Sequence, residues 1–301
     1  MQRLLIVYNP NSSQYVHVQK EVLLPIGKMK GFLIGKFAIE KLPFDKNVER
    51  LIEVLRDGDM VIAAGGDATA AVTANAILLS RVNATFVALP YGNFNDLART
   101  LNMGRALPPL ASSKIEKLYP LDIVVDGEHW RYATCYVTIG MTAEAVELFD
   151  DPKVREKMQK GRRSSWRSYL QLAKWYFRNR KKKVFLPDFR LNGGEVVSGA
   201  SDYCALSGRS MCRVMKGGDD YLKPKVFRSE NCQLTSFWRL TKLMMISILK
   251  RTPGSETKGD VLEFIKPATV EIQAEGEYKV FKNARRIEVR KAGNFIKVLH
   301  G

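Results

Sequence analysis

Cysteine and histidine are scarce in this sequence, which has four cysteines and three histidines among 301 residues. The cysteines, at positions 135, 204, 212 and 232, form no C-x-x-C pair, and no cluster of histidines accompanies them. Zinc sites and disulfide frameworks require such groupings, so the pattern argues against both. Without a disulfide framework, we expect the protein to work in a reducing cytoplasm.

Long apolar runs are also missing. The longest strongly apolar stretch in the C-terminal half, Leu243–Leu249, has seven residues, whereas a membrane-spanning helix needs about 20. The apolar run that follows Met1 is too short for a signal peptide and lacks a small-residue cleavage site. We therefore expect no membrane span and assign the first apolar residues to a strand.

Acidic residues are outnumbered by basic ones, with 31 aspartates and glutamates against 48 lysines and arginines and a net charge of +17. The field of such a molecule concentrates polyanions, which include nucleotides, nucleic acid and an anionic membrane surface. Two common phosphate-binding patterns, G-x-G-x-x-G and G-x-x-x-x-G-K-[ST], do not occur, which argues against a dinucleotide enzyme and a P-loop ATPase. The hydrophobic content of 46% is that of an ordinary globular protein.

Short apolar runs alternate with helical patterns over the first 120 residues. This alternation indicates an open, mainly parallel α/β sheet that binds its ligand at the carboxyl ends of the strands. Helices are predicted over 47–55 and from 67 to about 80. Strands, each followed by a loop with Gly, Pro or Asn or by a helical pattern, are predicted at Leu4–Tyr8, Phe32–Ile39, Met60–Ala64 and Thr85–Leu89.

From about residue 120 onward, strand-like segments dominate, which predicts a second, β-rich domain. We divide the chain into 1–120 and 121–301, with the last ~15 residues returning to the first domain. A ligand cleft is expected between the two domains. The predicted strands of the second part are Leu121–Val125, Tyr132–Ile139, Val184–Leu191, Ser201–Leu206, Val261–Phe264, Thr269–Ala274, Arg286–Val289 and Phe295–Leu299.

Two glycine-containing loops each follow a predicted strand and open a helix. In Gly65-Gly66-Asp67-Ala68-Thr69, the glycines let a polyphosphate approach the backbone, and the helix N-terminus attracts anions. Asp67 could hold Mg²⁺ or orient an acceptor hydroxyl. The second loop, Pro90–Arg99, places Asn95 or Asp96 as a helix cap. Each loop alone fits an ordinary capped turn, but on neighbouring strands the pair is expected to converge on one cleft.

These residues resemble the catalytic domain shared by diacylglycerol kinases, sphingosine kinases and bacterial lipid kinases and, more distantly, by NAD kinases. The matching segments keep the order and spacing of that family along nearly the whole chain. They are Asn9-Pro10, the two loops, Pro120-Leu121-Asp122, Ile139–Glu144, and Glu275-Gly276-Glu277 where the family has Asp-Gly-Glu.

The resemblance implies transfer of a phosphoryl group from ATP, bound with Mg²⁺, to a hydroxyl of diacylglycerol or a related lipid. Asp67, Glu275 and Glu277 would position and deprotonate that hydroxyl, and Asp67 would hold the catalytic Mg²⁺ through the nucleotide. Glu275 and Glu277 are expected on an extended segment, where alternate side chains point the same way. The implied nucleotide-binding residues are Asn9, Pro10, Gly65, Gly66, Ala68, Thr69, Gly92, Asn93, Asn95 and Asp96.

Several positions depart from the family pattern. Ala68 replaces the third glycine of the first loop, which costs about 1 kcal/mol if that position requires a positive φ. Ala71 and Val72 stand where the family has Asn and Glu, and Asn93 stands where it has Thr. The family's Asp-Gly-x-Leu-Asp metal motif reads Asp-Asp-Tyr-Leu-Lys from Asp219, which argues against a structural Mg²⁺ there.

Other hypotheses therefore stay open. One is a catalytically impaired kinase homologue that acts as a lipid- or anion-binding module. A third and weaker one is an NAD kinase, which fits the late motif and the basic segment less well. For Glu275 and Glu277, the plainer interpretation is a solvent-exposed turn with two acids.

The segment 155–183 concentrates positive charge, with twelve basic residues against one acid. Its helical pattern is amphipathic, and aromatic residues beside cations are typical of lipid headgroup level, so we expect peripheral membrane association. A helix packed on the second domain with a solvated basic face is the alternative. No nucleic-acid-binding motif occurs, and a homodimer is left open. The expected membrane contacts are Trp175, Arg178, Arg180, Lys181, Lys182 and Lys183.

Overall fold

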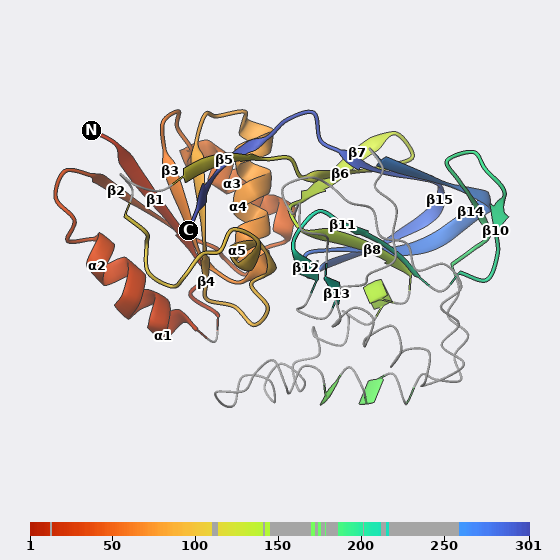
Figure 1. The fold of residues 1–301 in the computed structure, drawn as a ribbon, viewed down its shortest axis with the longest axis horizontal. Helices are drawn as coiled ribbons and strands as arrows, with labels where there is room; N and C mark the ends of the chain where they lie inside the picture. Colours follow the sequence, from red (N-terminus) through yellow and green to blue (C-terminus); the bar gives the residue numbers. More distant parts are fainter. Residues whose placement is uncertain are drawn as a thin grey trace. The chain divides into compact units, whose positions relative to one another are not determined.

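The chain folds into two compact units in a computed structural model. One unit comprises Met1–Pro120 with Ala292–Gly301, and the other comprises Leu121–Lys291 (Figure 1). The first holds a mainly parallel sheet and the second an antiparallel, β-rich sheet, so the predicted α/β fold class is confirmed. The structure describes residues 1–12, 14–109, 114–140, 142–144, 170–171, 174–175, 178, 186–200, 202–211, 215–216 and 259–301.

The sheet of the first unit has the strand order β2-β1-β3-β4-β16-β5. The strands from β2 to β16 in this order run parallel to one another, and only the edge strand β5 is antiparallel, paired with β16. The four strands predicted in this region are confirmed. The apolar runs of β1, β3 and β4 are buried inside the sheet, whereas β2 forms its edge and is mostly not buried. The strands are β1 Arg3–Tyr8, β2 Leu33–Ala38, β3 Met60–Gly65, β4 Thr85–Pro90, β5 Lys114–Leu118 and β16 Ile296–His300.

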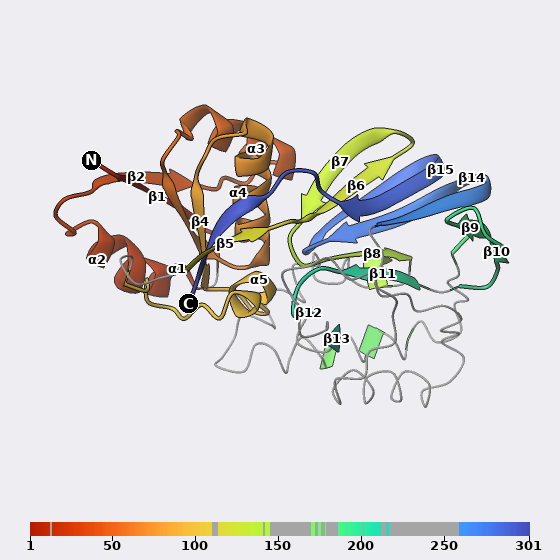
Figure 2. The same ribbon diagram turned by 45° about the horizontal axis from the view of Figure 1, so that its top comes forward.

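Helices cover both faces of this sheet. Helices α3 (Phe44–Val54) and α4 (Asp67–Ser80) lie on one face, while α1 and α2 lie on the other (Figure 2). Helix α4 is buried almost all round from Thr69 to Leu78, which explains its alanine-rich, uniformly apolar sequence. The remaining helices are α1 Tyr15–Val18, the π-helix η1 Gln19–Leu23, α2 Leu24–Ile26 and α5 Asp96–Thr100.

The register of the sheet aligns three strand ends. Ala64 of β3 pairs with Tyr8 of β1 on one side and with Leu89 of β4 on the other. The loops that follow β1, β3 and β4 therefore leave the same edge of the sheet side by side, which is where open α/β sheets bind ligands.

The second unit is built on a long antiparallel hairpin. Strands predicted separately at Val261–Phe264 and Thr269–Ala274 form one strand, β14, whose pairing with β15 is irregular between Glu263 and Val270. Pro267 lies in that irregular stretch, where its missing N–H breaks no regular ladder. The strands are β6 Leu121–Val125, β7 Glu128–Ala133, β8 Tyr136–Gly140, β9 Phe189–Leu191, β10 Val196–Val197, β11 Asp202–Leu206, β12 Ser210–Met211, β13 Met215–Lys216, β14 Gly259–Ala274 and β15 Glu277–Lys291.

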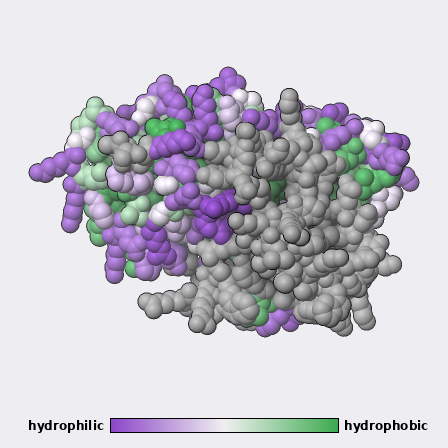
Figure 3. All heavy atoms as spheres, in the orientation of Figure 1, coloured by the Kyte–Doolittle hydropathy of each residue, from purple (hydrophilic) through white to green (hydrophobic). Residues whose placement is uncertain are grey.

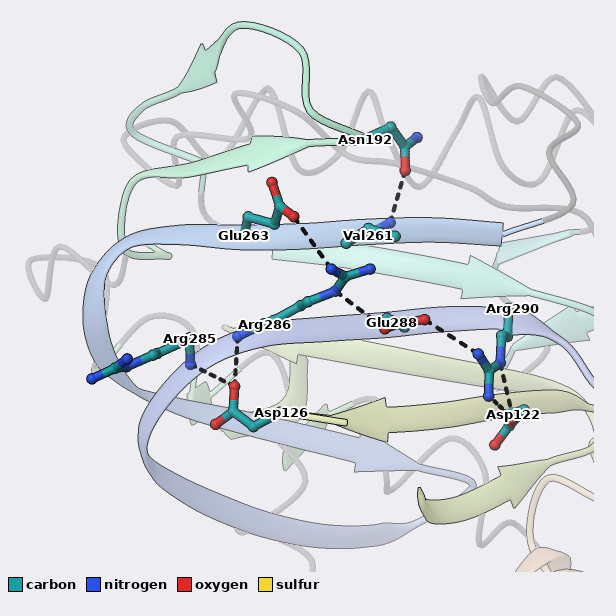
Figure 4. Close-up of polar contacts among 9 residues, drawn as sticks. All are labelled: Asp122, Asp126, Asn192, Val261, Glu263, Arg285, Arg286, Glu288 and Arg290. Atoms are coloured by element: carbon teal, nitrogen blue, oxygen red, sulfur yellow. Dashed lines mark hydrogen bonds and ion pairs between the residues drawn. The ribbon is translucent and has the colours of Figure 1, made fainter. Parts of the chain in front are cut away.

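Charged side chains form a ladder across β14, β15 and β6 (Figure 4). Arg286 contacts Glu263 at 3.6 Å and Glu288 at 3.1 Å, and Arg290 contacts Glu288 at 3.3 Å and Asp122 at 3.1 Å. Hydrogen bonds from His129 and Arg290 hold the pKa of Asp122 below its ordinary value, against the effect of burial. Because both arginines are about half exposed, the ladder orders this face and contributes little to stability.

Asp202 is a buried carboxyl at the start of β11, and Thr142 donates to it from Oγ1 and, at 3.3 Å, from its backbone N–H. Burial raises the pKa of Asp202 to about 7 against these hydrogen bonds. A carboxyl whose pKa is raised on folding stabilises the fold at low pH and loses that contribution as pH rises through the folded pKa.

The free energy of unfolding is therefore expected to fall by about 1.4 kcal/mol between about pH 6 and about pH 8. In Asp202→Asn this fall disappears, because the amide carries no titrating proton. Urea unfolding at the two pH values measures it. An equal fall in the variant and the parent protein would show that another group titrates.

Candidate functional site

The end of β1 turns through Asn9 and Pro10. The Asn9 side-chain oxygen accepts the N–H of Asn11 at 2.8 Å, and its carbonyl accepts the N–H of Ser12 at 3.1 Å. These bonds hold a tight turn at the edge where the three strand ends meet. Pro10 is exposed there, so both predicted residues lie at the expected edge of the sheet.

The loop after β3 has little room for side chains. A Cβ atom on Gly65 would lie 2.3 Å from the hydroxyl oxygen of Thr69, a residue that is buried in the first turn of α4. Ala68 is exposed, belongs to α4 and does not have a positive φ. The alanine at the family's third glycine position therefore adds no backbone strain, and the conditional cost of about 1 kcal/mol does not apply.

The two predicted loops touch through their backbones. A Cβ atom on Gly92 would lie 2.3 Å from the Cα of Gly66, and the N–H of Tyr91 donates to the Gly65 carbonyl at 2.9 Å. This approach requires glycine at position 92, whereas a Cβ atom on Gly66 would lie 3.1 Å from the Cα of Gly92, a tight contact. The structure thus brings the residues of the first loop and those of the second into one continuous surface at the edge of the sheet.

The Asp67 side chain in the first loop holds the second loop in place. Its Oδ1 accepts the N–H of Asp96 at 2.6 Å, and its Oδ2 accepts the N–H of Asn95 at 3.0 Å, so the carboxylate of the first loop caps the helix that follows the second. Burial raises the pKa of Asp67, while these N–H groups and the positive charge of Arg99 act in the opposite direction. Asp67 is therefore a positioning group for the second loop, whatever else it binds.

Asn95 occupies the cap position of α5, as predicted, but its side chain has a different task. The side-chain oxygen accepts the N–H of Gly92 at 2.6 Å, and the amide donates to the Gly92 carbonyl at 2.8 Å. Asn95 has a φ of 55°, in the left-handed region that asparagine tolerates better than most residues. Asp96 is buried and forms an ion pair with Arg99. Asn93, which follows Gly92 in the second loop, is half-buried.

The late acidic motif forms the turn of the β14–β15 hairpin. Glu275 and Gly276 both have positive φ, at 52° and 91°, which is the two-residue turn that suits antiparallel strands. The expectation of an extended segment with parallel side chains is wrong for Glu275, because the turn rotates it away from the strand geometry. Glu277 follows as the first residue of β15 and is half-buried.

Glu275 is only 4% exposed, so a solvent-exposed turn is also wrong for this residue. Its Oε1 accepts the Thr134 hydroxyl and the Cys135 N–H, which ties the hairpin turn to the turn between β7 and β8. Sequence reasoning missed Thr134, because no local pattern marks a partner 141 positions away. Asp67 belongs to the first unit, and Glu275 and Glu277 belong to the second. That the three acids share one cleft stays a prediction.

Of the predicted membrane-contact residues and the doubtful metal ligand Asp219, the structure describes only two. Trp175 is half-buried and Arg178 exposed in short helical stretches. Asp219, Arg180, Lys181, Lys182 and Lys183 lie outside the described residues. Among the residues that the structure places, no three His, Cys, Asp or Glu side chains form a group that could hold a metal, and no helix is long and apolar enough to cross a bilayer.

Residues 3–124 match the diacylglycerol kinase catalytic domain. The resemblance noted in the sequence is thereby confirmed over these residues. This diacylglycerol kinase match contains both glycine loops and ends at Val124, within β6. No curated protein matches the chain in sequence.

Solved structures share the fold over nearly the whole chain. A diacylglycerol kinase from Bacillus anthracis str. Sterne aligns with a TM-score of 0.64 at 15% identity, covering 99% of this chain and 97% of its own. Two further structures from that organism, provisionally assigned to the same enzyme class, align at 15% identity with TM-scores of 0.65 and 0.62. They cover 99% of this chain and 97% and 96% of their own chains. At this identity the likeness establishes the fold alone.

Proposed function

We propose that the protein is an ATP-dependent lipid kinase that phosphorylates a hydroxyl of diacylglycerol or a related lipid. The observation that carries the proposal is the backbone contact between Gly66 and Gly92, fixed by the bonds from Asp67 to the N-terminus of α5. This contact joins a helix N-terminus to a second glycine loop, and such backbone surfaces accept phosphates. The match to the diacylglycerol kinase catalytic domain supports the same reaction class.

The residues present are compatible with Mg²⁺ that arrives with ATP. Such an ion keeps several waters and phosphate oxygens and needs only one or two protein carboxylates, so a group of three acids is not required. Asp67 and Asp96 are the acids at the loop contact, and each carboxylate oxygen can accept more than one interaction. When bound, the ion would neutralise charge on the transferred phosphoryl group.

In the proposed reaction the lipid hydroxyl oxygen bonds to the γ-phosphorus, the bond to the bridging oxygen breaks, ADP leaves, and the hydroxyl proton passes to a carboxylate. Glu277 is the better candidate for that acceptor within the late motif, because it is half-buried on β15. Glu275 is buried and accepts bonds from Thr134 and Cys135. We assign Glu275 to positioning the turn that presents Glu277.

Asp67→Asn tests the proposal. The amide can accept only through its single oxygen, so one of the N–H groups of Asn95 and Asp96 loses its acceptor and the second loop loosens. We expect turnover of diacylglycerol in mixed vesicles to fall by about a hundredfold, which corresponds to about 2.7 kcal/mol. Transfer of labelled phosphate from ATP measures it, and Asp45→Asn, at an exposed position on α3, is the control. Equal turnover in both variants would refute the role of Asp67.

A catalytically impaired homologue is the second candidate, and the buried, hydrogen-bonded carboxylate of Glu275 favours it. That candidate predicts binding of lipid vesicles without any transfer of phosphate from ATP. Thermal unfolding with and without Mg-ATP separates the two, because a ligand that binds only the folded state raises the unfolding temperature.

A further inference from the structure

A large buried side chain stands at the start of the second glycine loop. Tyr91 follows directly after β4 and precedes Gly92, the residue whose backbone contacts Gly66. Tyr91 is 1% exposed and is one of the largest side chains that the described residues bury completely. Because a buried tyrosine hydroxyl needs a hydrogen-bond partner, the partners of this hydroxyl show what holds the ring in place.

The Tyr91 hydroxyl reaches the π-helix that follows α1. It lies 3.0 Å from the Glu21 carboxylate and 3.0 Å from the main-chain carbonyl of Arg105, and it donates its single proton to these two acceptors. The guanidinium of Arg105 also lies over the ring, 5.5 Å from its centre. Burial, followed by the hydrogen bond to Glu21, raises the pKa of Tyr91, so the hydroxyl keeps its proton at neutral pH.

Glu21 is a charged acceptor for this proton. Its Oε1 lies 3.0 Å from the His17 ring, and its Oε2, which accepts from Tyr91, lies 4.0 Å from the Arg105 guanidinium. Against the effect of burial, the hydrogen bonds with His17 and Tyr91 lower the pKa of Glu21, so the carboxylate is ionised at neutral pH. A hydrogen bond to an ionised acceptor is stronger than one between two neutral groups.

The helix that carries Glu21 is itself packed on the first unit. It extends from Tyr15 to Ile26 through α1, the π-helix and α2. Figure 3 shows purple and green atoms of this region at the surface where Figure 1 draws α1 and α2. The bond between Glu21 and Tyr91 therefore joins a surface helix to a buried residue of the glycine loop. The buried side chains of the helix are Val18, Val22, Leu23 and Ile26.

The main chain of Tyr91 continues the connection to the first loop. Its N–H donates to the Gly65 carbonyl at 2.9 Å. With the ring held by Glu21 and the N–H held by Gly65, the peptide that joins Tyr91 to Gly92 is fixed at both ends. The second loop is thus held from two sides, by Asp67 at the N-terminus of α5 and by Tyr91 at the end of β4.

We propose that Tyr91 is a positioning residue for Mg-ATP, and that its hydrogen bond to Glu21 holds the second glycine loop in the form that accepts phosphate. Because the side chain is buried, Tyr91 acts through the backbone of Gly92. A loop that is already ordered loses less entropy when its ligand binds, so loosening it weakens binding. The proposal rests on the proposed kinase function, since it names a residue that prepares the nucleotide site of that enzyme.

Tyr91→Phe tests the proposal, because it keeps the ring and removes the proton that Glu21 accepts. We expect the dissociation constant of Mg-ATP in isothermal titration and the KM for ATP to rise about tenfold. The kcat at saturating ATP is expected to change by less than about twofold, since the same phosphate contacts weaken in the ground state and the transition state.

Tyr203→Phe is the matched control. It removes a hydrogen bond of the same kind, from the Tyr203 hydroxyl to the Asp260 carboxylate at 3.0 Å, between two buried residues of the second unit. The control is expected to bind Mg-ATP as tightly as the parent protein does, although it also loses a buried hydrogen bond. Equal weakening of Mg-ATP binding in Tyr91→Phe and Tyr203→Phe would show a general loss of structure and overturn the proposal.

Variants of Glu21 identify the partner of Tyr91. Glu21→Ala removes one of the two acceptors and is expected to weaken Mg-ATP binding about fivefold, whereas Glu21→Gln keeps an acceptor oxygen and is expected to restore binding close to that of the parent protein. In the double variant Tyr91→Phe, Glu21→Ala, the second change is expected to add no further loss, because both changes break one bond. Fully additive losses would contradict the proposed pairing.

Hydrogen–deuterium exchange without nucleotide separates this proposal from the kinase proposal. The amides of residues 91–96 are expected to exchange at least about tenfold faster in Tyr91→Phe than in the parent protein or in Tyr203→Phe. Faster exchange in a protein that never binds Mg-ATP would refute the kinase proposal and retain Tyr91 as the residue that holds the loop. Unchanged exchange, or faster exchange with an unchanged dissociation constant of Mg-ATP, would overturn the role proposed for Tyr91.

Discussion

Gly92→Ala is expected to weaken Mg-ATP binding by at least about tenfold and to lower the free energy of unfolding by about 2 kcal/mol, the usual effect of overpacking. The new Cβ would lie 2.3 Å from the Cα of Gly66 and 2.9 Å from the side-chain oxygen of Asn95. Neither neighbour can yield cheaply, because one is backbone and the other is bonded to the Gly92 peptide. The two loops must separate, and the surface they share is lost.

Isothermal titration with Mg-ATP and urea unfolding measure the two effects. Gly104→Ala is the matched control, because Gly104 lies in the same unit and has no positive φ, and a methyl group added there would meet no neighbouring atom within 4 Å. The control is expected to bind and unfold as the parent protein does. If Gly92→Ala binds Mg-ATP as tightly as Gly104→Ala, the loop contact does not form the phosphate site.

Asp59→Ala is expected to lower the free energy of unfolding by about 3 kcal/mol, because removal of one partner from a buried ion pair leaves the other charge uncompensated. Asp59 is 2% exposed and accepts the Arg3 guanidinium at 2.9 and 2.6 Å and the Arg56 N–H at 2.8 Å. These bonds join the start of β1 to the start of β3, so the loss falls on the centre of the parallel sheet.

Urea unfolding measures this loss against Glu49→Ala, which breaks an exposed pair with Lys46 on α3. The control is expected to change stability by about 0.5 kcal/mol or less, since exposed pairs contribute little. If Asp59→Ala lowered the free energy of unfolding only as little as Glu49→Ala, water would reach the Asp59 ion pair in solution.

Local patterns were sufficient for much of the first unit. The runs at Leu4–Tyr8 and Met60–Ala64 are strands because continuous apolar residues suit a sheet covered on both faces. The helix at Tyr15–Ile26 was not predicted, since valines and Pro25 weaken its local preference and packing of Val18, Val22 and Ile26 overrides it. The split prediction within β14 follows from Pro267, which interrupts the pattern but not the strand.

The sequence by itself determined the alternation of strands and helices, the positive charge, and the two glycine loops at strand ends, because each depends on neighbours within a few residues. Only the tertiary structure decided what the acids do. Asp67 bonds to groups 28 and 29 positions away, and Glu275 to a hydroxyl 141 positions away. No periodicity or motif specifies such partners, since they meet only when the register of the sheet and the hairpin turn bring distant segments together.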